Sequence, residues 1–162
     1  MSKRQTYGVP YQGSKNRIAE DIIALLPKGK RFVDLFAGGC AMTHCALLSD
    51  KWERVLCNDK YPIRGQEVFR QACDGEFNKP EYFRIVSKEE FMRRRFIEGW
   101  MIDVWGWNGL TRYIGTPFES FCRNNNITDI RQLETTKQKY PLYSLRRLQR
   151  LAGIDLSTSD FT

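Results

Sequence analysis

The stretch Arg31-Phe-Val-Asp-Leu-Phe-Ala-Gly-Gly-Cys-Ala-Met42 decides the fold of this chain. It opens with a short apolar run, Phe32–Phe36, which contains one acidic residue, Asp34. The chain then turns through Gly38-Gly39 into residues 41–48, which are compatible with a helix. A strand, a glycine turn and a helix place backbone N–H groups at the carboxyl end of a parallel strand, where ligands bind. The stretch has neither Gly-x-x-x-x-Gly-Lys-Ser nor Gly-x-Gly-x-x-Gly, so it predicts a nucleoside cofactor without a pyrophosphate.

A second buried strand is predicted over residues 53–58, and an acidic residue, Asp59, follows it. Two carboxylate oxygens can accept hydrogen bonds from both ribose hydroxyls at once, and the spacing of about twenty residues from the glycine turn suits that role. A helix is predicted from Pro62 to about Cys73. The alternation of strands and helices predicts an α/β fold with a parallel sheet.

The rest of the chain is predicted to be mostly helical, and it ends in a third strand. Hydrophobic spacing, capping residues and breakers set the boundaries. In chain order we predict a helix through Ile18–Leu26, a capped helix from Ser87 to Met101, a tight turn at Asn108-Gly109, an irregular loop over residues 115–126, a helix carrying Ile127, Ile130 and Leu133, a helix from Pro141 to Leu151, and a strand over residues 154–161.

Length and composition exclude several classes of protein. A chain of 162 residues predicts one domain. No apolar run approaches the ~20 residues of a membrane span, so no membrane partner is expected. The five cysteines form no Cys-x-x-Cys pair, which predicts reduced thiols, no metal site and a cytoplasmic location. A net charge of +7 favours a polyanionic partner such as nucleic acid.

Four stretches together resemble the Dam-like family of adenine-specific (N6) DNA methyltransferases, which use S-adenosylmethionine. They are Pro10-Tyr-Gln-Gly-Ser-Lys15, Phe32-Val-Asp-Leu-Phe-Ala-Gly-Gly39, Cys57-Asn-Asp59 and Trp107-Asn-Gly-Leu-Thr-Arg112. A fifth stretch, Ser159-Asp160-Phe161, is similar to the segment that carries an acid for the cofactor's adenine. All five occur in the family's order across nearly the whole chain.

The resemblance implies S-adenosylmethionine as cofactor and double-stranded DNA as partner. Lys15 would meet the carboxylate of the cofactor's methionine, and Asp34 would meet its ammonium group directly or through water. Trp100, Trp105 and Trp107 are predicted to be core residues. The implied cofactor-binding residues are Tyr11, Gly13, Lys15, Asp34, Phe36, Gly38, Gly39, Asp59, Asp160 and Phe161, and the implied DNA-binding residues are Asn108, Leu110 and Arg112.

The implied fold is an incomplete Rossmann-like methyltransferase sheet with an inserted, mostly helical target-recognition subdomain. Residues 1–78 and 141–162 would form the partial cofactor-binding core, and residues 79–140 the insertion. Cys40 departs from the family, which commonly has a glycine at this place in the cofactor turn.

A larger departure is that the catalytic Asp/Asn-Pro-Pro-Tyr of the family should follow Phe161, yet no Pro-Pro occurs in the sequence. We therefore expect the N-terminal portion of such an enzyme, truncated or one half of a split enzyme, which has no catalytic residue of its own and is inactive alone. Residues 31–36 would expose an unpaired strand edge, which a second polypeptide or a homodimer would cover. The alternatives are an inactive nucleic-acid-binding protein that retains the fold and an RNA adenine methyltransferase.

Overall fold

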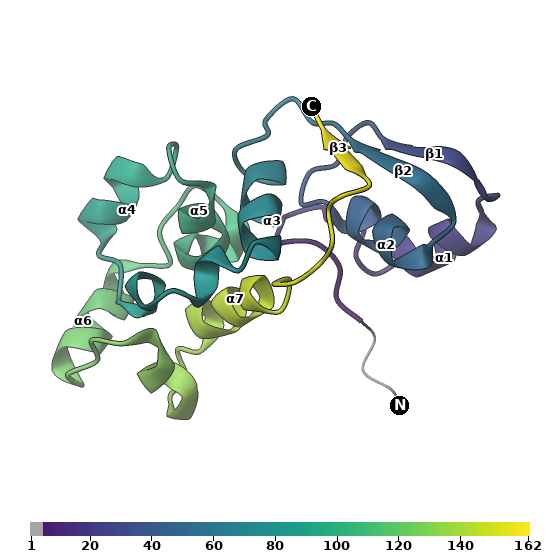
Figure 1. The fold of residues 1–162 in the computed structure, drawn as a ribbon. Helices are drawn as coiled ribbons and strands as arrows, with labels where there is room; N and C mark the ends of the chain where they lie inside the picture. Colours follow the sequence, from purple (N-terminus) through teal and green to yellow (C-terminus); the bar gives the residue numbers. More distant parts are fainter. Residues whose placement is uncertain (1–4) are drawn as a thin grey trace.

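The computed structural model describes residues 5–162, without the side chains of Asn108 and Thr116. Two lobes are visible in Figure 1, a small sheet with helices α1 and α2, and a group of helices from α3 to α7. The elements are α1 Ala19–Leu25, β1 Gly29–Asp34, α2 Ala41–Ser49, β2 Trp52–Cys57, α3 Gln66–Cys73, η1 Glu76–Asn78, η2 Pro80–Phe83, α4 Lys88–Arg94, α5 Gly99–Trp105, η3 Trp107–Gly109, α6 Thr116–Asn124, η4 Ile130–Thr135, α7 Tyr140–Gln149 and β3 Ser159–Phe161.

The sheet is parallel throughout and has the order β1-β2-β3, which confirms the predicted α/β class. Asp34 pairs with Cys57, and Cys57 pairs with Phe161. The carboxyl ends of all three strands therefore meet at one edge of the sheet, where ligands bind in parallel α/β folds.

In the described part of the chain, helices cover one face of the sheet. Phe32 and Val55 are buried in a core that also includes residues of α1 and α2. On the other face Val33 is 45% exposed, and Arg54 lies at the surface. Within residues 5–162, β1 pairs with β2 and with no other strand, so its outer edge is open.

The larger core belongs to the helical lobe. Phe69 of α3, Trp105 of α5 and Leu148 of α7 are fully buried in it. Helix α7 packs against α3 and η1, which lie in residues 1–78, and against α5 and η4, which lie in residues 79–140. None of the helices within residues 5–162 is long and apolar enough to cross a membrane.

Several of the predicted boundaries were wrong, and the helix expected to carry Ile127, Ile130 and Leu133 is the 3-10 helix η4, which begins at Ile130. The helix expected from Ser87 to Met101 is two helices, α4 and α5, because the chain turns before Gly99. A Cβ atom on Gly99 would lie 2.2 Å from the Ile63 carbonyl oxygen, so α5 begins in close contact with the loop after β2. The Ser87 cap itself is confirmed, since its hydroxyl accepts a hydrogen bond of 3.1 Å from the Glu90 N–H.

Residues 115–126 were predicted to form an irregular loop, but most of them form helix α6. Pro117 stands in its first turn, where a proline needs no N–H donor. Phe118 and Cys122, one turn apart, are buried and hold the helix against the core. The final strand is also shorter than predicted, because only Ser159–Phe161 pair with β2.

Candidate functional site: a cavity at the carboxyl ends of the strands

The turn between β1 and α2 is shaped by a left-handed backbone and by one acidic residue. Gly38 has φ +50°, a conformation that glycine adopts without steric cost. Its N–H donates a hydrogen bond of 2.8 Å to Oδ2 of Asp59, which follows β2. The N–H of Val9 donates to the Gly39 carbonyl at 2.8 Å, so the turn is also tied to the N-terminal segment.

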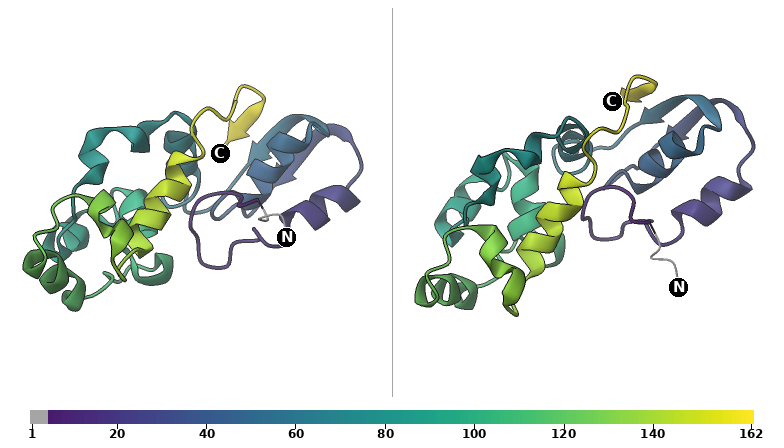
Figure 2. Two further views of the ribbon diagram at one scale, coloured as in Figure 1. Left: turned by 90° about the horizontal axis from the view of Figure 1, so that it is seen from below. Right: turned by 60° about the horizontal axis from the view of Figure 1, so that its bottom comes forward.

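Tyr11 packs directly on the glycine turn. A Cβ atom on Gly39 would lie only 2.4 Å from the Cβ of Tyr11, and one on Gly38 would lie 3.0 Å from its ring. Figure 2 shows the N-terminal segment, in purple, passing between the two lobes. The segment is fixed there by the N–H of Gly8, which donates to Nδ1 of His44 at 3.0 Å.

These contacts enclose a cavity of about 210 Å³. Seven of the ten predicted cofactor-binding residues line it, and they come from three separate parts of the sequence. Four further lining residues were not predicted: Ser14 and Ala37, which stand within the two motifs, and Ala41 and Met42, which follow the second motif closely. The seven predicted residues are Tyr11, Gly13, Lys15, Phe36, Gly38, Gly39 and Asp59.

The cavity combines charged and aromatic groups. The ammonium group of Lys15 donates to the Gly13 carbonyl at 3.1 Å. Phe36 is 89% exposed, although large apolar side chains of this kind usually pack against something. The Asp59 carboxylate accepts hydrogen bonds from the N–H groups of Gly38 and Tyr61, at 2.8 and 2.9 Å.

Asp34 does not line the cavity. Its Oδ2 accepts hydrogen bonds from the Thr43 hydroxyl at 2.8 Å and from the Thr43 N–H at 3.1 Å, which join β1 to the first turn of α2. Burial raises the pKa of this carboxyl group, while the two hydrogen bonds oppose the rise and the nearby Asp59 adds to it. Its predicted contact with a cofactor ammonium group stays a prediction.

Asp160 and Phe161 also lie apart from the cavity. The Asp160 carboxylate is exposed and forms an ion pair of 2.5 Å with Arg54 on the uncovered face of the sheet. Phe161 points to the opposite face, where its ring lies 6.4 Å from that of Phe69 and under the guanidinium group of Arg70. Their predicted cofactor contacts likewise stay predictions.

Cys40 fits the turn without narrowing the cavity. Its φ is +60°, the left-handed conformation that explains why a glycine suits this position. The side chain is fully buried, and its sulfur lies 3.7 Å from the sulfur of Cys57 in β2. Cys40 does not line the cavity, so the core accommodates the cysteine side chain that stands in place of the family's glycine.

The predicted DNA-binding residues lie on a closed loop between α5 and α6. Gly106 and Tyr113 form an antiparallel bridge, and the Trp107 N–H donates to the Arg112 carbonyl at 2.6 Å. Leu110 is 37% exposed, and Arg112 lies at the surface. The Asn108 side chain is outside the described part of the structure.

The tryptophan prediction holds for two residues and fails for the third. Trp100 and Trp105 are buried, whereas Trp107 is 55% exposed on the loop between α5 and α6. The antiparallel pairing on either side of the loop turns Trp107 toward solvent, a geometry that hydrophobic spacing along the chain does not reveal.

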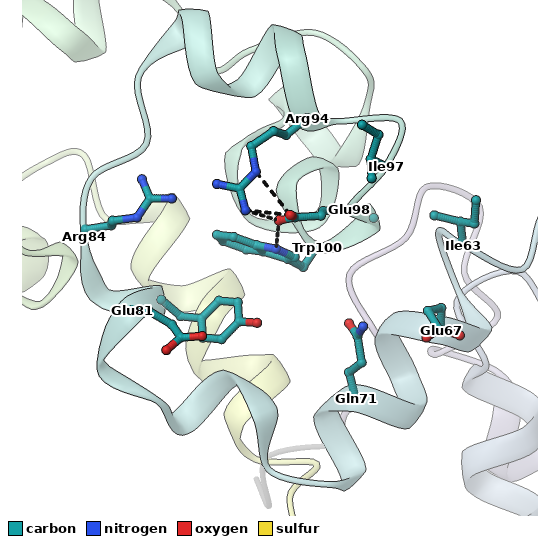
Figure 3. A pocket seen from close by; sticks show the side chains of 11 residues that line it. Ile63, Glu67, Gln71, Glu81, Arg84, Arg94, Ile97, Glu98 and Trp100 are labelled. Carbon is teal, nitrogen blue, oxygen red and sulfur yellow. Dashed lines mark hydrogen bonds and ion pairs between the residues drawn. The ribbon is translucent and has the colours of Figure 1, made fainter.

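A second cavity, of about 380 Å³, lies between α3 and the α4–α5 region and contains no predicted site residue. Glu98 accepts hydrogen bonds there from Arg94 and from the indole N–H of Trp100 (Figure 3). Glu67 and Gln71 of α3 line its other side. Within residues 5–162 no group of three or more His, Cys, Asp or Glu side chains is arranged to hold a metal ion.

Comparison with known proteins agrees with the position of these motifs. No curated protein matches the sequence significantly. The D12 class N6 adenine-specific DNA methyltransferases match over residues 11–145, which include Tyr11, the glycine turn, Asp59 and the loop between α5 and α6. This match covers most of the sequence, and the chain therefore belongs to the D12 class N6 adenine-specific DNA methyltransferase family.

Proposed function

We propose that this chain is the cofactor-binding and DNA-recognition part of an adenine DNA methyltransferase that uses S-adenosylmethionine. The observation that carries the proposal is the cavity of about 210 Å³, in which residues from three motifs far apart in sequence meet. Membership of the family supports the reaction class, and the cavity supports a binding site for the cofactor.

The residues of the cavity fit S-adenosylmethionine by their chemistry. Lys15 offers a cation for the carboxylate of the methionine portion, and Asp59 offers acceptors for the ribose hydroxyls. The exposed ring of Phe36 offers an apolar surface for the adenine. When bound, S-adenosylmethionine supplies an electrophilic methyl group; the chain's own residues bind and orient it.

We assign double-stranded DNA as partner to the loop between α5 and α6, which is called the recognition loop from here on. Arg112 can contact phosphate or guanine, and the net charge of +7 favours a polyanion. On this proposal residues 79–140 form the target-recognition insertion, and residues 1–78 with 141–162 form the partial Rossmann-like core. A cytoplasmic location is supported by the five cysteines, all free and buried.

The catalytic motif is proposed to come from strands that pair with β1. The sequence contains no Asp-Pro-Pro-Tyr, the segment that would accept hydrogen bonds from the amino group of a flipped adenine. The open edge of β1 and the exposed side chains of Val33 and Leu35 support further pairing there. A second polypeptide or a longer form of the chain would supply the strands with the motif, whereas a second copy of this chain would cover the open edge without supplying the motif.

Two other functions remain as alternatives. An inactive nucleic-acid-binding protein would bind DNA without binding S-adenosylmethionine. An RNA adenine methyltransferase would prefer RNA to a DNA duplex of the same sequence. The exposed side chains of Trp107 and Arg112 are compatible with both alternatives, so binding measurements separate them.

The experiment is a calorimetric comparison of cofactors and nucleic acids with the purified chain. We expect binding of S-adenosylmethionine and S-adenosylhomocysteine but not of NAD⁺ or ATP, because the turn lacks the pyrophosphate-binding glycine patterns. We also expect duplex DNA to bind more tightly than duplex RNA. The proposal is contradicted if S-adenosylmethionine, S-adenosylhomocysteine, NAD⁺ and ATP bind equally well, or if the chain prefers duplex RNA.

A further inference from the structure

Arg64, in the loop between β2 and α3, contacts two structures that the proposed function treats separately. One nitrogen of its guanidinium group, Nη2, donates a hydrogen bond of 2.5 Å to the carbonyl of Gly109 on the recognition loop. The same guanidinium group lies 5.1 Å from the centre of the Tyr11 ring, which lines the proposed cofactor cavity. A single side chain thus touches the DNA-recognition segment and the cofactor site.

The residue after Arg64 presses against the glycine turn itself. A Cβ atom on Gly65 would lie 1.5 Å from the carbonyl oxygen of Gly38, so the two backbones are in direct contact. On its other side Gly38 is held by the hydrogen bond that its N–H donates to the Asp59 carboxylate. Any displacement of the Arg64-Gly65 backbone therefore acts directly on the turn that shapes the cavity.

A buried acid lies behind Arg64. Asp103 of α5 is fully buried, and neither of its carboxylate oxygens accepts a hydrogen bond from any residue that the structure describes. Burial raises the pKa of this carboxyl group well above its usual range, and the positive charges of Arg64 and Arg147 act in the opposite direction. The Nε atoms of both arginines are themselves buried and have no hydrogen-bond partner among residues 5–162.

Arg147 extends the same cluster to the start of the N-terminal segment. Its Nη2 donates a hydrogen bond of 2.9 Å to the carbonyl of Tyr7. Arg64 contacts the segment at Tyr11 and Arg147 contacts it at Tyr7, so two arginines whose charges both act on Asp103 contact the two ends of a single stretch.

We propose that Arg64, which contacts both Gly109 and Tyr11, is a positioning residue through which DNA on the recognition loop raises the affinity of the cavity for the cofactor. The inference rests on the proposed function, because it assumes that the loop binds DNA and the cavity binds S-adenosylmethionine. DNA bound to the loop holds the backbone at Gly109, whose carbonyl accepts the hydrogen bond from Arg64. Arg64 in turn holds the Tyr11 ring, and its neighbour Gly65 holds the backbone of Gly38, in the arrangement that binds the cofactor. By thermodynamic reciprocity the cofactor tightens DNA binding by the same factor.

The test measures the affinity of S-adenosylhomocysteine with and without saturating adenine-containing duplex DNA. For the unaltered chain we expect DNA to tighten binding by roughly 5- to 150-fold, the usual range of coupling between two sites. In Arg64→Gln, and in Arg64→Lys, which lacks the planar fork, we expect the factor to fall toward one. Arg131→Gln is the matched control, since it removes the same charge from an exposed ion pair with Asp129 and should leave the coupling intact.

Thermal unfolding of each Arg64 variant checks that the variant is folded before its coupling factor is measured. Two different substitutions at Arg64 that both lower the factor assign the effect to the guanidinium group.

The outcomes separate the inference from the function beneath it. If the unaltered chain binds neither ligand, the proposed function fails and the inference fails with it. If it binds both but the coupling factor is one, or if the factor is the same in both Arg64 variants as in Arg131→Gln, only the inference is overturned.

Discussion

The backbone N–H of Gly38 donates a hydrogen bond of 2.8 Å to Oδ2 of Asp59, across 21 positions of sequence. The other carboxylate oxygen, Oδ1, accepts from the Tyr61 N–H at 2.9 Å. Each carboxylate oxygen has two acceptor sites, so both hydrogen bonds leave capacity for ribose hydroxyls. Asp59 therefore has two roles in this account: it shapes the turn before any ligand binds, and it is the acceptor proposed for the ribose.

Gly39→Ala should weaken binding of S-adenosylmethionine by displacing Tyr11. The new methyl group would lie 2.4 Å from the Tyr11 Cβ and 3.1 Å from the Val9 carbonyl oxygen, so one of them must move. Overpacking of this kind costs about 1–3 kcal/mol of folding stability, measurable by urea denaturation. Gly29→Ala is the control, because its methyl group would meet only the Trp52 ring, at an ordinary 3.6 Å. Unchanged affinity in Gly39→Ala would show that Tyr11 does not contribute to the site.

The stability of the chain should fall in mild acid because of His44. Burial lowers the pKa of this imidazole from 6.5 to about 4, and the charge of Arg147 adds to the shift. The unfolded chain therefore binds a proton between these pH values that the folded chain excludes, so stability is full above pH 6.5 and is lost as the pH falls toward 4. From about pH 7 to about pH 4.5 the loss is about 2 kcal/mol.

Urea denaturation of the unaltered chain and of His44→Gln at the two pH values checks this prediction. Glutamine keeps an acceptor for the Gly8 N–H but does not titrate. The difference in unfolding free energy between the two pH values should be smaller in the variant by about 2 kcal/mol. Equal pH dependence in both proteins would mean that folding does not lower the pKa of His44.

Arg112 should contribute to DNA binding and to its salt dependence. Each lost phosphate contact lowers the slope of log affinity against log salt by about one, so Arg112→Ala should reduce the slope by that amount if the contact is to phosphate. A contact to guanine would instead weaken sequence preference, by about 1–3 kcal/mol at one base pair. Titration of duplex DNA at several salt concentrations separates these cases. Affinity that hardly changes with salt, or Arg112→Ala behaving as the unaltered chain, rules out the recognition role.

The 162-residue polypeptide by itself should transfer no methyl group to adenine. Without Asp-Pro-Pro-Tyr nothing positions the acceptor nitrogen, and positioning lowers such barriers by about 7–11 kcal/mol. An assay with radiolabelled S-adenosylmethionine and adenine-containing duplex DNA measures this directly. Addition of a polypeptide with the missing motif and strands should restore transfer. Turnover by the purified chain alone, abolished by substitution of its own residues, would show that the catalytic centre lies within it.

Motifs with local causes were predictable from the sequence. Gly38-Gly39 after an apolar run predicted the turn between β1 and α2. Ser87, three residues before Glu90, predicted the start of α4. Asp59 was found by the same logic, because the end of the next parallel strand must lie beside the turn. The cavity follows from these local signals, which explains why most of the predicted cofactor residues lie together.

Features set by contacts between distant residues could not be predicted. The break before Gly99 depends on its approach to Ile63, and helix α6 is stabilised by burial of Phe118 and not by its polar composition. Asp34 occupies a position in the turn motif that suggests a ligand, yet its carboxylate accepts two hydrogen bonds from Thr43. The same limit applies to Arg64, whose contacts with Gly109 and Tyr11 have no sequence signature.

Calorimetric titration of S-adenosylmethionine into the unaltered chain, Asp59→Ala and Asp155→Ala tests the central claim most directly. Asp155 is an exposed acid outside the cavity, so Asp155→Ala makes the same charge change without touching the site. Hydrogen bonds to a charged group are worth about 1.5–3 kcal/mol each, so Asp59→Ala should weaken binding at least about tenfold, while Asp155→Ala binds as the unaltered chain does. Failure of the unaltered chain to bind S-adenosylmethionine, or equal affinity in all three proteins, would contradict the assignment of this cavity to the cofactor.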